Sequence, residues 1–597
     1  MHLIAKSIKG REYFYLVEKE RRGKRVVTSR TVYIGDRQKL AELVQQSAAA
    51  ALPSSFDAQP VGAELALATV AGELGFEDLI DEVCPVRQGA AAVGRCLVIA
   101  AIDRVVTARR HNGLKNLRGH YEGSVLAEVL PIAAAGLDNQ RMHEMLVDLT
   151  DREIEQIEGA AVRRLIEREG VSTSSLAFDC TNFDSYAGAK TRSRLLRRGH
   201  PKSGRPLRVL GLGLLATADD GMPLLTFTYP GNENDVTAFG RFLRALDRRR
   251  ASLDLDLDTT IAADGGNISQ QLLLRLEKDP RYYVLRLPAH HLPELVRCKR
   301  SELPGLRGSF QGKVWAQKHL CRVYGKERGV VDVYSQRMHQ RQLPGLRRDQ
   351  DRARSDLLEL QRLLERQRQG LRRAKPITLR ALRARVEKAL SREHMDALFR
   401  VTTAKGADAP TLTFEEPPEA WQHLEDYVLG RSLLVTNRDD WPPEQVVAAS
   451  RVQSHNEHLF RDLKDPGGVS MLPLRHRRDR ALRAHALLVV LGLMLAKVLQ
   501  RRIKRAGLAA PSLASVLDPL KQVQRAHVDF PPSAPPALRA LAADVWIPSK
   551  QTPRQQELLA ALQLADRPEL GTTLADKLSR KKPGRHRKNA QQPGKSR

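Results

Sequence analysis

One stretch of the chain, residues 175–287, orders its strand-like and helix-like segments in a way that few folds share. Short apolar runs bounded by turn residues predict strands, and apolar positions three and four residues apart predict helices. In chain order the predicted elements are the strands Ser175–Cys180, Arg208–Ala216 and Met222–Tyr229, the helix Val236–Arg249, the strand Thr259–Ala263, the helix Ser269–Lys278 and the strand Tyr282–Leu287. Three strands, a helix, a strand, a helix and a strand is the order of a ribonuclease-H-like core.

Two of these strands lead into an aspartate. Asp179 follows the apolar start of the first strand, and Asp264 follows the fourth strand. Beyond the strand Ser432–Val435, Glu457 lies on a predicted helix, Pro442–Leu463. Three carboxylates from two strands and a helix can hold two divalent cations, and such a site cuts and rejoins phosphodiester bonds. Carboxylate oxygens suit Mg²⁺, so we expect Mg²⁺ as the cofactor, with Mn²⁺ able to substitute.

The fold class that we predict is multidomain α/β. A ribonuclease-H-like catalytic core is interrupted by a mixed β/helical insertion and preceded by a small β unit and a helical domain. The predicted blocks are a basic N-terminal β-hairpin unit (1–50), a helical domain (51–170), the first part of the core (171–288), the insertion with a charged helix (289–429), the second part of the core with the Glu457 helix (430–509) and a loop-rich region with a basic disordered tail (510–597). Residues 51–170 are either a DNA-end-binding domain or a helical packing domain without DNA contacts.

The charge of the chain favours a polyanionic partner. It carries 98 Lys and Arg against 69 Asp and Glu, a net charge of +29. A surface this basic attracts nucleic acid and releases its counterions on binding. The alternative is a generally basic cytosolic protein without such a partner.

Cysteine usage and hydropathy indicate a cytoplasmic protein. The five cysteines form no Cys-x-x-Cys pair, which argues for a reducing compartment and against a zinc module. No targeting segment is recognisable at the N-terminus. The most apolar run, Ala486–Ala496, is shorter than the roughly 20 residues that span a bilayer, so we expect a buried helix and no membrane partner.

Six short blocks follow one another along the chain in an order that carries a family resemblance. They are Asp179–Phe183, Arg198–Pro206, Pro223–Asp235, Ala263–Gly266, Leu434–Asn437 and Asn456–Pro466. In content and order they resemble bacterial insertion-sequence transposases of the DDE type, in the IS-four-like superfamily whose members have a β-rich insertion before the catalytic Glu. The resemblance implies that Asp179, Asp264 and Glu457 are the catalytic triad and the metal ligands.

The same resemblance gives roles to the residues around Glu457. Lys464 has a counterpart in the Tyr/Arg/Glu/Lys motif of the superfamily, whereas Ser450 and Gln453 stand where that motif has Tyr and Arg. A Gln at this position is a trait of a subgroup with the same Lys-Asp-Pro ending. Ser450 removes an aromatic side chain that could contact DNA.

Helical spacing places Gln453, Glu457, Arg461 and Lys464 on one polar stripe. We expect Gln453 to contact DNA and Arg461 and Lys464 to hold phosphates beside the cleaved bond. The alternative for Arg461 is a surface ion pair with Glu457, four residues away.

A second set of DNA contacts is predicted in the loop between the first two strands of the core. His200, Lys202 and Arg205 make this loop basic, and it could bind the DNA backbone beside the catalytic site. The alternative is a solvated loop without a ligand.

Together these features predict a transposase that binds the terminal inverted repeats of its own element as a homodimer on double-stranded DNA. It would cleave by Mg²⁺-dependent hydrolysis and join the 3′-hydroxyl ends to target DNA. One rival is a ribonuclease-H-like nuclease that cuts without joining. The other is a decayed transposase that only binds DNA.

Overall fold

The computed structural model of the 597-residue chain forms two compact units. One unit contains Met1–Asp81, Pro85–His143 and Leu495–Arg597, and the other contains Glu82–Cys84 and Glu144–Met494. The structure describes residues 2–22, 25–50, 52–85, 92–107, 113–188, 190–199, 204–205, 207–249, 258–264, 269–277, 282–371, 375–465, 467–542 and 545–572. We call the units the terminal unit and the central unit.

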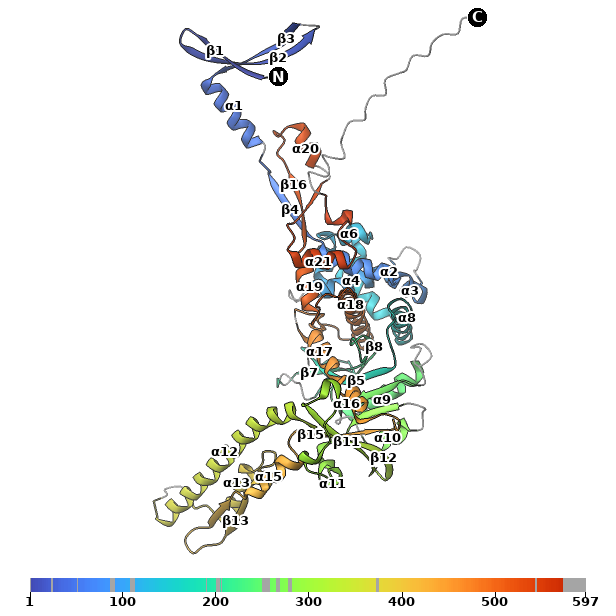
Figure 1. The fold of residues 1–597 in the computed structure, drawn as a ribbon, viewed down its shortest axis with the longest axis vertical. Coiled ribbons are helices and arrows are strands. Elements are labelled where there is room, and N and C mark those ends of the chain that lie inside the picture. The colour runs from blue at the N-terminus through green and yellow to red at the C-terminus, as the bar shows by residue number, and fades with distance from the viewer. Residues whose placement is uncertain are drawn as a thin grey trace, which may run out of the picture. The chain divides into compact units, whose positions relative to one another are not determined.

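The central unit is built on a nine-stranded sheet within the described residues (Figure 1). Its order is β11-β12-β15-β10-β9-β5-β7-β6, with β8 paired to β7. β9 runs parallel to both β5 and β10, and the other pairs are antiparallel. The strands are β5 (Ser175–Ser185), β6 (Arg197–Arg198), β7 (Arg208–Thr217), β8 (Pro223–Pro230), β9 (Thr260–Ala263), β10 (Tyr282–Arg286), β11 (Val314–Val323), β12 (Lys326–Ser335) and β15 (Arg431–Thr436).

Alternation along β5 sets which helix covers each face of this sheet. Phe178 stacks on Phe242 of helix α9 (Asp235–Arg249), with ring centroids 3.9 Å apart. Successive side chains of a strand point to opposite faces, so Asp179 lies on the face away from α9. On that face α17 (Gln453–Lys464) contacts β5. One face of the sheet is therefore an aromatic core, and the other carries the predicted catalytic residue.

A buried ion pair closes the free edge of β8. Glu158 of α8 (Asp151–Glu169) pairs with Arg249, and both side chains are almost fully buried. Glu158 accepts a hydrogen bond from Thr226 N at 3.0 Å, and Arg249 donates to Thr226 O at 3.4 Å. The pair thus satisfies backbone groups that an edge strand would leave unpaired.

The predicted multidomain α/β class is confirmed, and the elements of the first part of the core lie within a few residues of their predicted bounds. The helices of this part are α9 and α10 (Gln270–Leu276). The predicted helix Pro442–Leu463 is wrong as a single element, because it is interrupted at Val452 between α16 (Pro443–Arg451) and α17. The α-helical spacing of apolar residues continues through this interruption and conceals it.

The predicted separation of core and insertion is only half right. The hairpin β11–β12 belongs to the central sheet, because β12 pairs with β15 from Gly329↔Thr436 to Tyr334↔Arg431. Its apolar side chains extend the same core. The part that stands apart is the segment from α12 to α15, which we call the arm.

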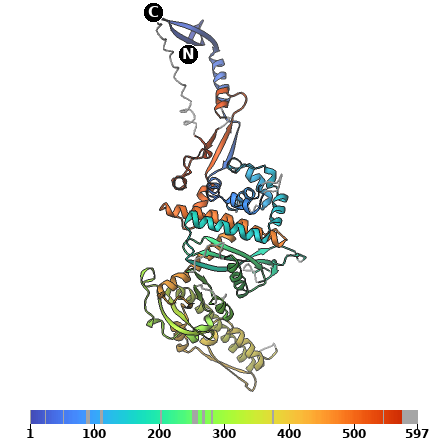
Figure 2. The same ribbon diagram turned by 90° about the vertical axis from the view of Figure 1, so that its right-hand side faces the viewer.

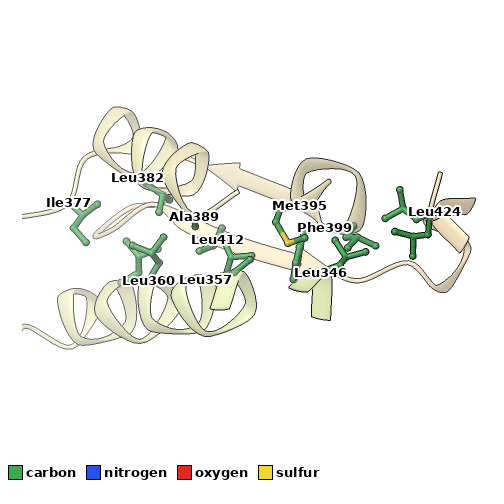
Figure 3. Close-up of a cluster of buried hydrophobic side chains, with 14 residues drawn as sticks. Leu346, Leu357, Leu360, Ile377, Leu382, Ala389, Met395, Phe399, Leu412 and Leu424 are labelled. Carbon is green, nitrogen blue, oxygen red and sulfur yellow. The ribbon is translucent and has the colours of Figure 1, made fainter. Parts of the chain in front are cut away.

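The arm is a helical hairpin with a small sheet and its own hydrophobic core. Leu346, Leu357 and Leu360 of α12 face residues of the following elements (Figure 3). The elements are α12 (Gln336–Arg368), α13 (Leu379–Ala389), α14 (Met395–Leu398), β13 (Arg400–Ala404), β14 (Thr411–Glu415) and α15 (Pro418–Tyr427). The charged helix that the sequence predicts in the insertion is α12. The short α11 (Leu292–Leu295) precedes the arm in the chain.

The terminal unit combines helices with two small sheets. The N-terminal sheet has the order β1-β2-β3 and is followed by α1 (Figure 2), so the predicted hairpin has a third strand. A second sheet has the order β17-β16-β4. The elements are β1 (His2–Ile8), β2 (Arg11–Arg22), β3 (Arg25–Asp36), α1 (Arg37–Ala50), β4 (Ser55–Pro60), α2 (Gly62–Glu73), α3 (Phe76–Val83), α4 (Val93–Val106), α5 (Leu117–Glu122), α6 (Leu126–Val129), α7 (Asn139–Asp148), α19 (Ala514–Lys521), β16 (Gln524–Asp529), α20 (Pro536–Ala542), β17 (Trp546–Pro548) and α21 (Pro553–Ala561).

The prediction of a loop-rich region after residue 510 is wrong for the part that the structure describes. That part holds three helices and two strands. Pro536 and Pro553 are the first residues of α20 and α21, where the missing N–H costs nothing. These prolines therefore mark helix starts. The predicted disordered basic tail, which includes Arg580–Lys588, lies outside the described residues.

One helix is long and apolar enough to cross a membrane by length and composition. It is α18 (Asp479–Arg505), which contains the predicted buried run. Of its most apolar 18-residue window, 89% is buried inside the protein. A core helix of a globular protein has this property.

Candidate active site

Strand register brings Asp179 and Asp264 to neighbouring positions. β5 and β9 pair in parallel up to Phe178↔Ala263, and Asp179 and Asp264 are the next residue of each strand. Adjacent strands lie about 4.8 Å apart, so the two aspartates come as close as two sheet residues can. Asp179 is half-buried and Asp264 is exposed. We call this position, where β9 ends beside the middle of β5, the carboxylate edge.

Sequence reasoning missed Arg286, which lies at the same level of the sheet. β9 and β10 pair up to Ala263↔Leu285, so Arg286 is the neighbour of Asp264 on the other side. Its Nη1 is 4.0 Å from Asp264 Oδ1, and both side chains are largely exposed. A basic residue at the end of the fifth strand was visible in the sequence, but its partner follows only from the strand register.

Helix α17 presents Lys464 to the face of β5 that carries Asp179. The Lys464 ammonium donates a hydrogen bond to Thr181 Oγ1 and lies 5.7 Å from the centre of the Phe183 ring. Asp179, Thr181 and Phe183 alternate along β5 and therefore share this face. The structure thus places Lys464 on the sheet face of Asp179, as the predicted polar stripe of α17 requires.

Glu457 and Arg461 are exposed on the same helix, and within the described chain no ion pair joins them. Among the residues that the structure describes, no three acidic, His or Cys side chains are grouped to hold a metal ion. The strand register makes Asp179 and Asp264 neighbours, but together with Glu457 they form no such group in the described residues. A third carboxylate placed beside two others is repelled by both, and a cation offsets that repulsion.

The residues around Glu457 include one costly buried group. Asn456 is fully buried, and neither polar atom of its side chain has a hydrogen-bond partner in the described part of the chain. Such a group costs roughly 1–3 kcal/mol. Ser450 donates its hydroxyl proton to Val447 O at 2.8 Å, within α16. Gln453 begins α17, and its side chain lies outside what is described.

The predicted basic loop is described only in part. His200 and Lys202 lie outside the described residues, while Arg205 is exposed just before β7. Gly199, the residue before His200, packs against Gly231, and a Cβ added to Gly199 would lie 2.0 Å from Gly231 O. The start of this loop is therefore fixed by a close backbone approach that only glycine permits.

The block Leu434–Asn437 has a structural explanation. Thr436 Oγ1 donates to Tyr283 O at 2.6 Å, and Asn437 Oδ1 accepts from Tyr283 N at 2.8 Å. These bonds tie the end of β15 to the start of β10, and β10 carries Arg286 at its other end. The block holds the strand that borders the carboxylate edge.

The donor chemistry of the carboxylate edge fits a hard divalent cation. Two adjacent carboxylates offer four oxygens, and the exposure of Asp264 leaves room for the waters that Mg²⁺ keeps. Among the described positions next to the two aspartates, Cys180 is the one soft ligand, and alternation along β5 points it to the opposite face of the sheet. The edge can therefore bind a cation together with phosphate oxygens.

Comparison with known proteins gives two findings. Residues 188–495 match the sequence model of a family described as Transposase DDE domain. A cryo-EM structure of a piggyBac transposase synaptic complex with hairpin DNA is similar at a TM-score of 0.35 and 11% sequence identity, covering 78% of this chain and 82% of that one. No curated protein matches the chain.

Proposed function

The chain belongs to the family of transposases with a DDE domain, and from this premise we propose that it cuts the ends of its own element and joins them to target DNA. Membership makes it a transposase enzyme. The reaction steps, the metal and the assembly are our proposal. The observation that carries it is the adjacency of Asp179 and Asp264 across the parallel pair β5–β9.

We propose a ribonuclease-H-like core around this pair. The five strands β10-β9-β5-β7-β8 have the order 5-4-1-2-3 when numbered along the chain, with 1, 4 and 5 parallel. That arrangement delivers the ends of strands 1 and 4 to one edge. It supports a core in which the acids come from the two central strands.

In this proposal Asp179, Asp264 and Glu457 hold Mg²⁺, with Mn²⁺ able to replace it. A bound ion supplies Lewis acidity for the attack of water or a 3′-hydroxyl on phosphorus. Asp179 and Asp264 provide two fixed carboxylates, and Glu457 adds the third from α17. Arg286 holds Asp264 by a charge contact from the neighbouring strand.

The residues of α17 bind the substrate. Lys464, held against β5 by Thr181 and Phe183, places one positive charge beside Asp179. Arg461 is exposed one helical turn from Glu457 and is free to form a two-pronged contact with a phosphate. We propose that these two side chains, with Gln453 and the loop of His200, Lys202 and Arg205, hold the backbone on both sides of the scissile bond.

Recognition of the ends is assigned to the helical region 51–170, and two copies of the chain pair the two ends. The net charge of +29 supports binding to duplex DNA. Two alternatives remain as outcomes of the test, namely a nuclease that does not join ends and a DNA-binding protein without catalysis.

The test is cleavage of a labelled duplex that carries the end of the element, with Mg²⁺. Wild type is compared with Glu457→Gln and with the control Asp440→Asn, which removes an exposed carboxylate between β15 and α16. We expect nicking and joined products with wild type and control, and neither with Glu457→Gln. Cleavage without joining would select the nuclease, and binding without cleavage in Mg²⁺ and Mn²⁺ would select the binding protein.

A further inference from the structure

The outer face of α12 carries a row of arginines along nearly its whole length. The row, which we call the arginine stripe, consists of Arg337, Arg341, Arg348, Arg352, Arg362 and Arg366. At 100° per residue these six side chains fall within roughly 80° of one another. All six are exposed. From first to last they span about 43 Å at 1.5 Å per residue.

The stripe lies opposite the face that α12 buries. The buried residues lie roughly 120° to 180° around the helix from the centre of the stripe; they are Leu346, Ala353, Leu357, Leu360 and Leu364. They pack against the other elements of the arm (Figure 3). The stripe therefore cannot turn inward without breaking the arm, and its charges stay in solvent.

Few acids neutralise the stripe. Glu359 is the one acidic residue that lies within its angular range. The ion pair of Arg352 with Asp349 is 3.8 Å long and exposed, so it contributes little. Asp351 is engaged with Arg354 at 2.7 Å, off the stripe. The row is therefore a strong, linear positive surface.

The stripe begins at the carboxylate edge. Arg286, 4.0 Å from Asp264, also donates a hydrogen bond to Met338 Sδ at 3.6 Å in the first turn of α12. Arg337, the first residue of the stripe, adds its charge to burial in lowering the pKa of Arg451 at the end of α16. One residue separates Arg451 from the helix that carries Glu457. The stripe thus leads away from the site where the phosphodiester bond would be cut.

We propose that the arginine stripe is a track for the phosphate backbone of the duplex on which the carboxylate edge acts. This inference rests on the proposed function and adds to it a surface for the DNA beyond the scissile bond. A length of about 43 Å corresponds to about 13 base pairs. Guanidinium groups pair with phosphates in two-pronged contacts. The stripe carries no aromatic side chain, so it lacks the stacking platform that single strands need.

The test measures binding of the full chain to a labelled 30-base-pair duplex of arbitrary sequence across a salt series. The stripe variant is Arg337→Gln, Arg341→Gln, Arg348→Gln and Arg352→Gln combined. The control removes the same charge from exposed positions of the same arm by Arg380→Gln, Arg385→Gln, Lys388→Gln and Lys405→Gln. Glutamine keeps the helix, and melting curves of both variants confirm folding.

We expect the slope of log affinity against log salt to fall by about 3 to 4 in the stripe variant, since each lost phosphate contact removes about 0.9. The control should change it by less than 1. Glu359→Gln should tighten binding a few-fold. An equal loss in stripe variant and control, or no loss in the stripe variant, would overturn the proposal.

The end duplex and a target duplex identify which DNA uses the track. Weaker cleavage by the stripe variant assigns the track to the element's end, and normal cleavage with weaker joining assigns it to the target. If wild type binds with the expected slopes but never cleaves, the proposed function fails while the track stands. If wild type cleaves and the stripe variant behaves as the control does, only the track fails.

Discussion

Carboxylates lie in two contrasting environments in this protein. Glu158 is buried against Arg249 and seals the edge strand β8, whereas Asp179 and Asp264 lie side by side where β9 ends next to β5, with Asp264 exposed to solvent. A buried acid needs a partner because desolvation is costly. Two adjacent acids repel one another and weaken the fold slightly. From this contrast we infer that the first kind of carboxylate stabilises the fold and that the second is available to a ligand.

Asp179→Asn should separate activity from stability most sharply. We expect cleavage of the end duplex to fall by a factor on the order of 10³ or more, about 4 kcal/mol of barrier, because a ligand of the cation is lost. The melting temperature should stay the same or rise, since one of two repelling charges is gone. A clear fall in melting temperature would place Asp179 with the structural acids.

Glu158→Gln should show the opposite pattern. Breaking one partner of a buried pair leaves Arg249 uncompensated, so the central unit should lose roughly 3–5 kcal/mol of unfolding free energy. Chemical denaturation measures this loss. The double change Glu158→Leu with Arg249→Met should cost less than Glu158→Gln alone. A double variant as unstable as the single one would show that the strand contacts, not the charge, dominate.

A second cluster of buried carboxylates lies in the terminal unit, around a histidine, and it should make the free energy of unfolding depend on pH. His120 Nδ1 lies 3.0 Å from Asp103 and Nε2 lies 3.5 Å from Glu64. Burial lowers the pKa of His120, but the hydrogen bonds and charges of the two acids outweigh it and raise the pKa to about 9.

The stability that His120 contributes should therefore be complete below its unfolded pKa of about 6.5 and disappear as pH rises through about 9. The shift corresponds to roughly 3 kcal/mol. Unfolding of wild type and His120→Gln, followed between pH 6 and pH 10, measures it. The variant should lack this slope, and a wild type equally stable at both ends would contradict the assignment.

Arg286→Gln should have the smallest effect. The contact of Arg286 with Asp264 is exposed, so it contributes at most about 1 kcal/mol of interaction free energy. Because Arg286 competes with a cation for Asp264, the Mg²⁺ concentration for half-maximal cleavage should fall by up to about fivefold. The midpoint of a Mg²⁺ titration gives the answer. A midpoint that rises would show that Arg286 helps to form the metal site.

Much of the central sheet could be predicted from the sequence because its strands are apolar and bounded by turns. β7 is predicted as Arg208–Ala216 and runs one residue further, to Thr217. Helix α9 starts at Asp235 because the Asn234 side chain caps it, accepting a hydrogen bond from Thr237 N. The two aspartates followed from the same pattern, since each ends or interrupts an apolar run. Local periodicity carries this information.

What depends on contacts distant in sequence could not be predicted. The pairing of Glu158 with Arg249 joins residues far apart in the chain, and nothing in the sequence distinguishes either residue from an exposed charged residue. The position of Arg286 beside Asp264 needs the register of β9 and β10. The interruption at Val452, between α16 and the helix of Glu457, leaves the helical spacing of its neighbours unchanged. Register, pairing and helix direction are tertiary properties.

Metal rescue of Asp264→Cys tests whether the carboxylate edge holds the metal that drives DNA cleavage. A thiolate binds Mg²⁺ poorly and accepts the softer Mn²⁺ better. We predict that Asp264→Cys cleaves the end duplex in Mn²⁺ but not in Mg²⁺, while wild type and Asp440→Cys cleave in both. Equal activity of Asp264→Cys in the two metals, at the wild-type level, would contradict the account.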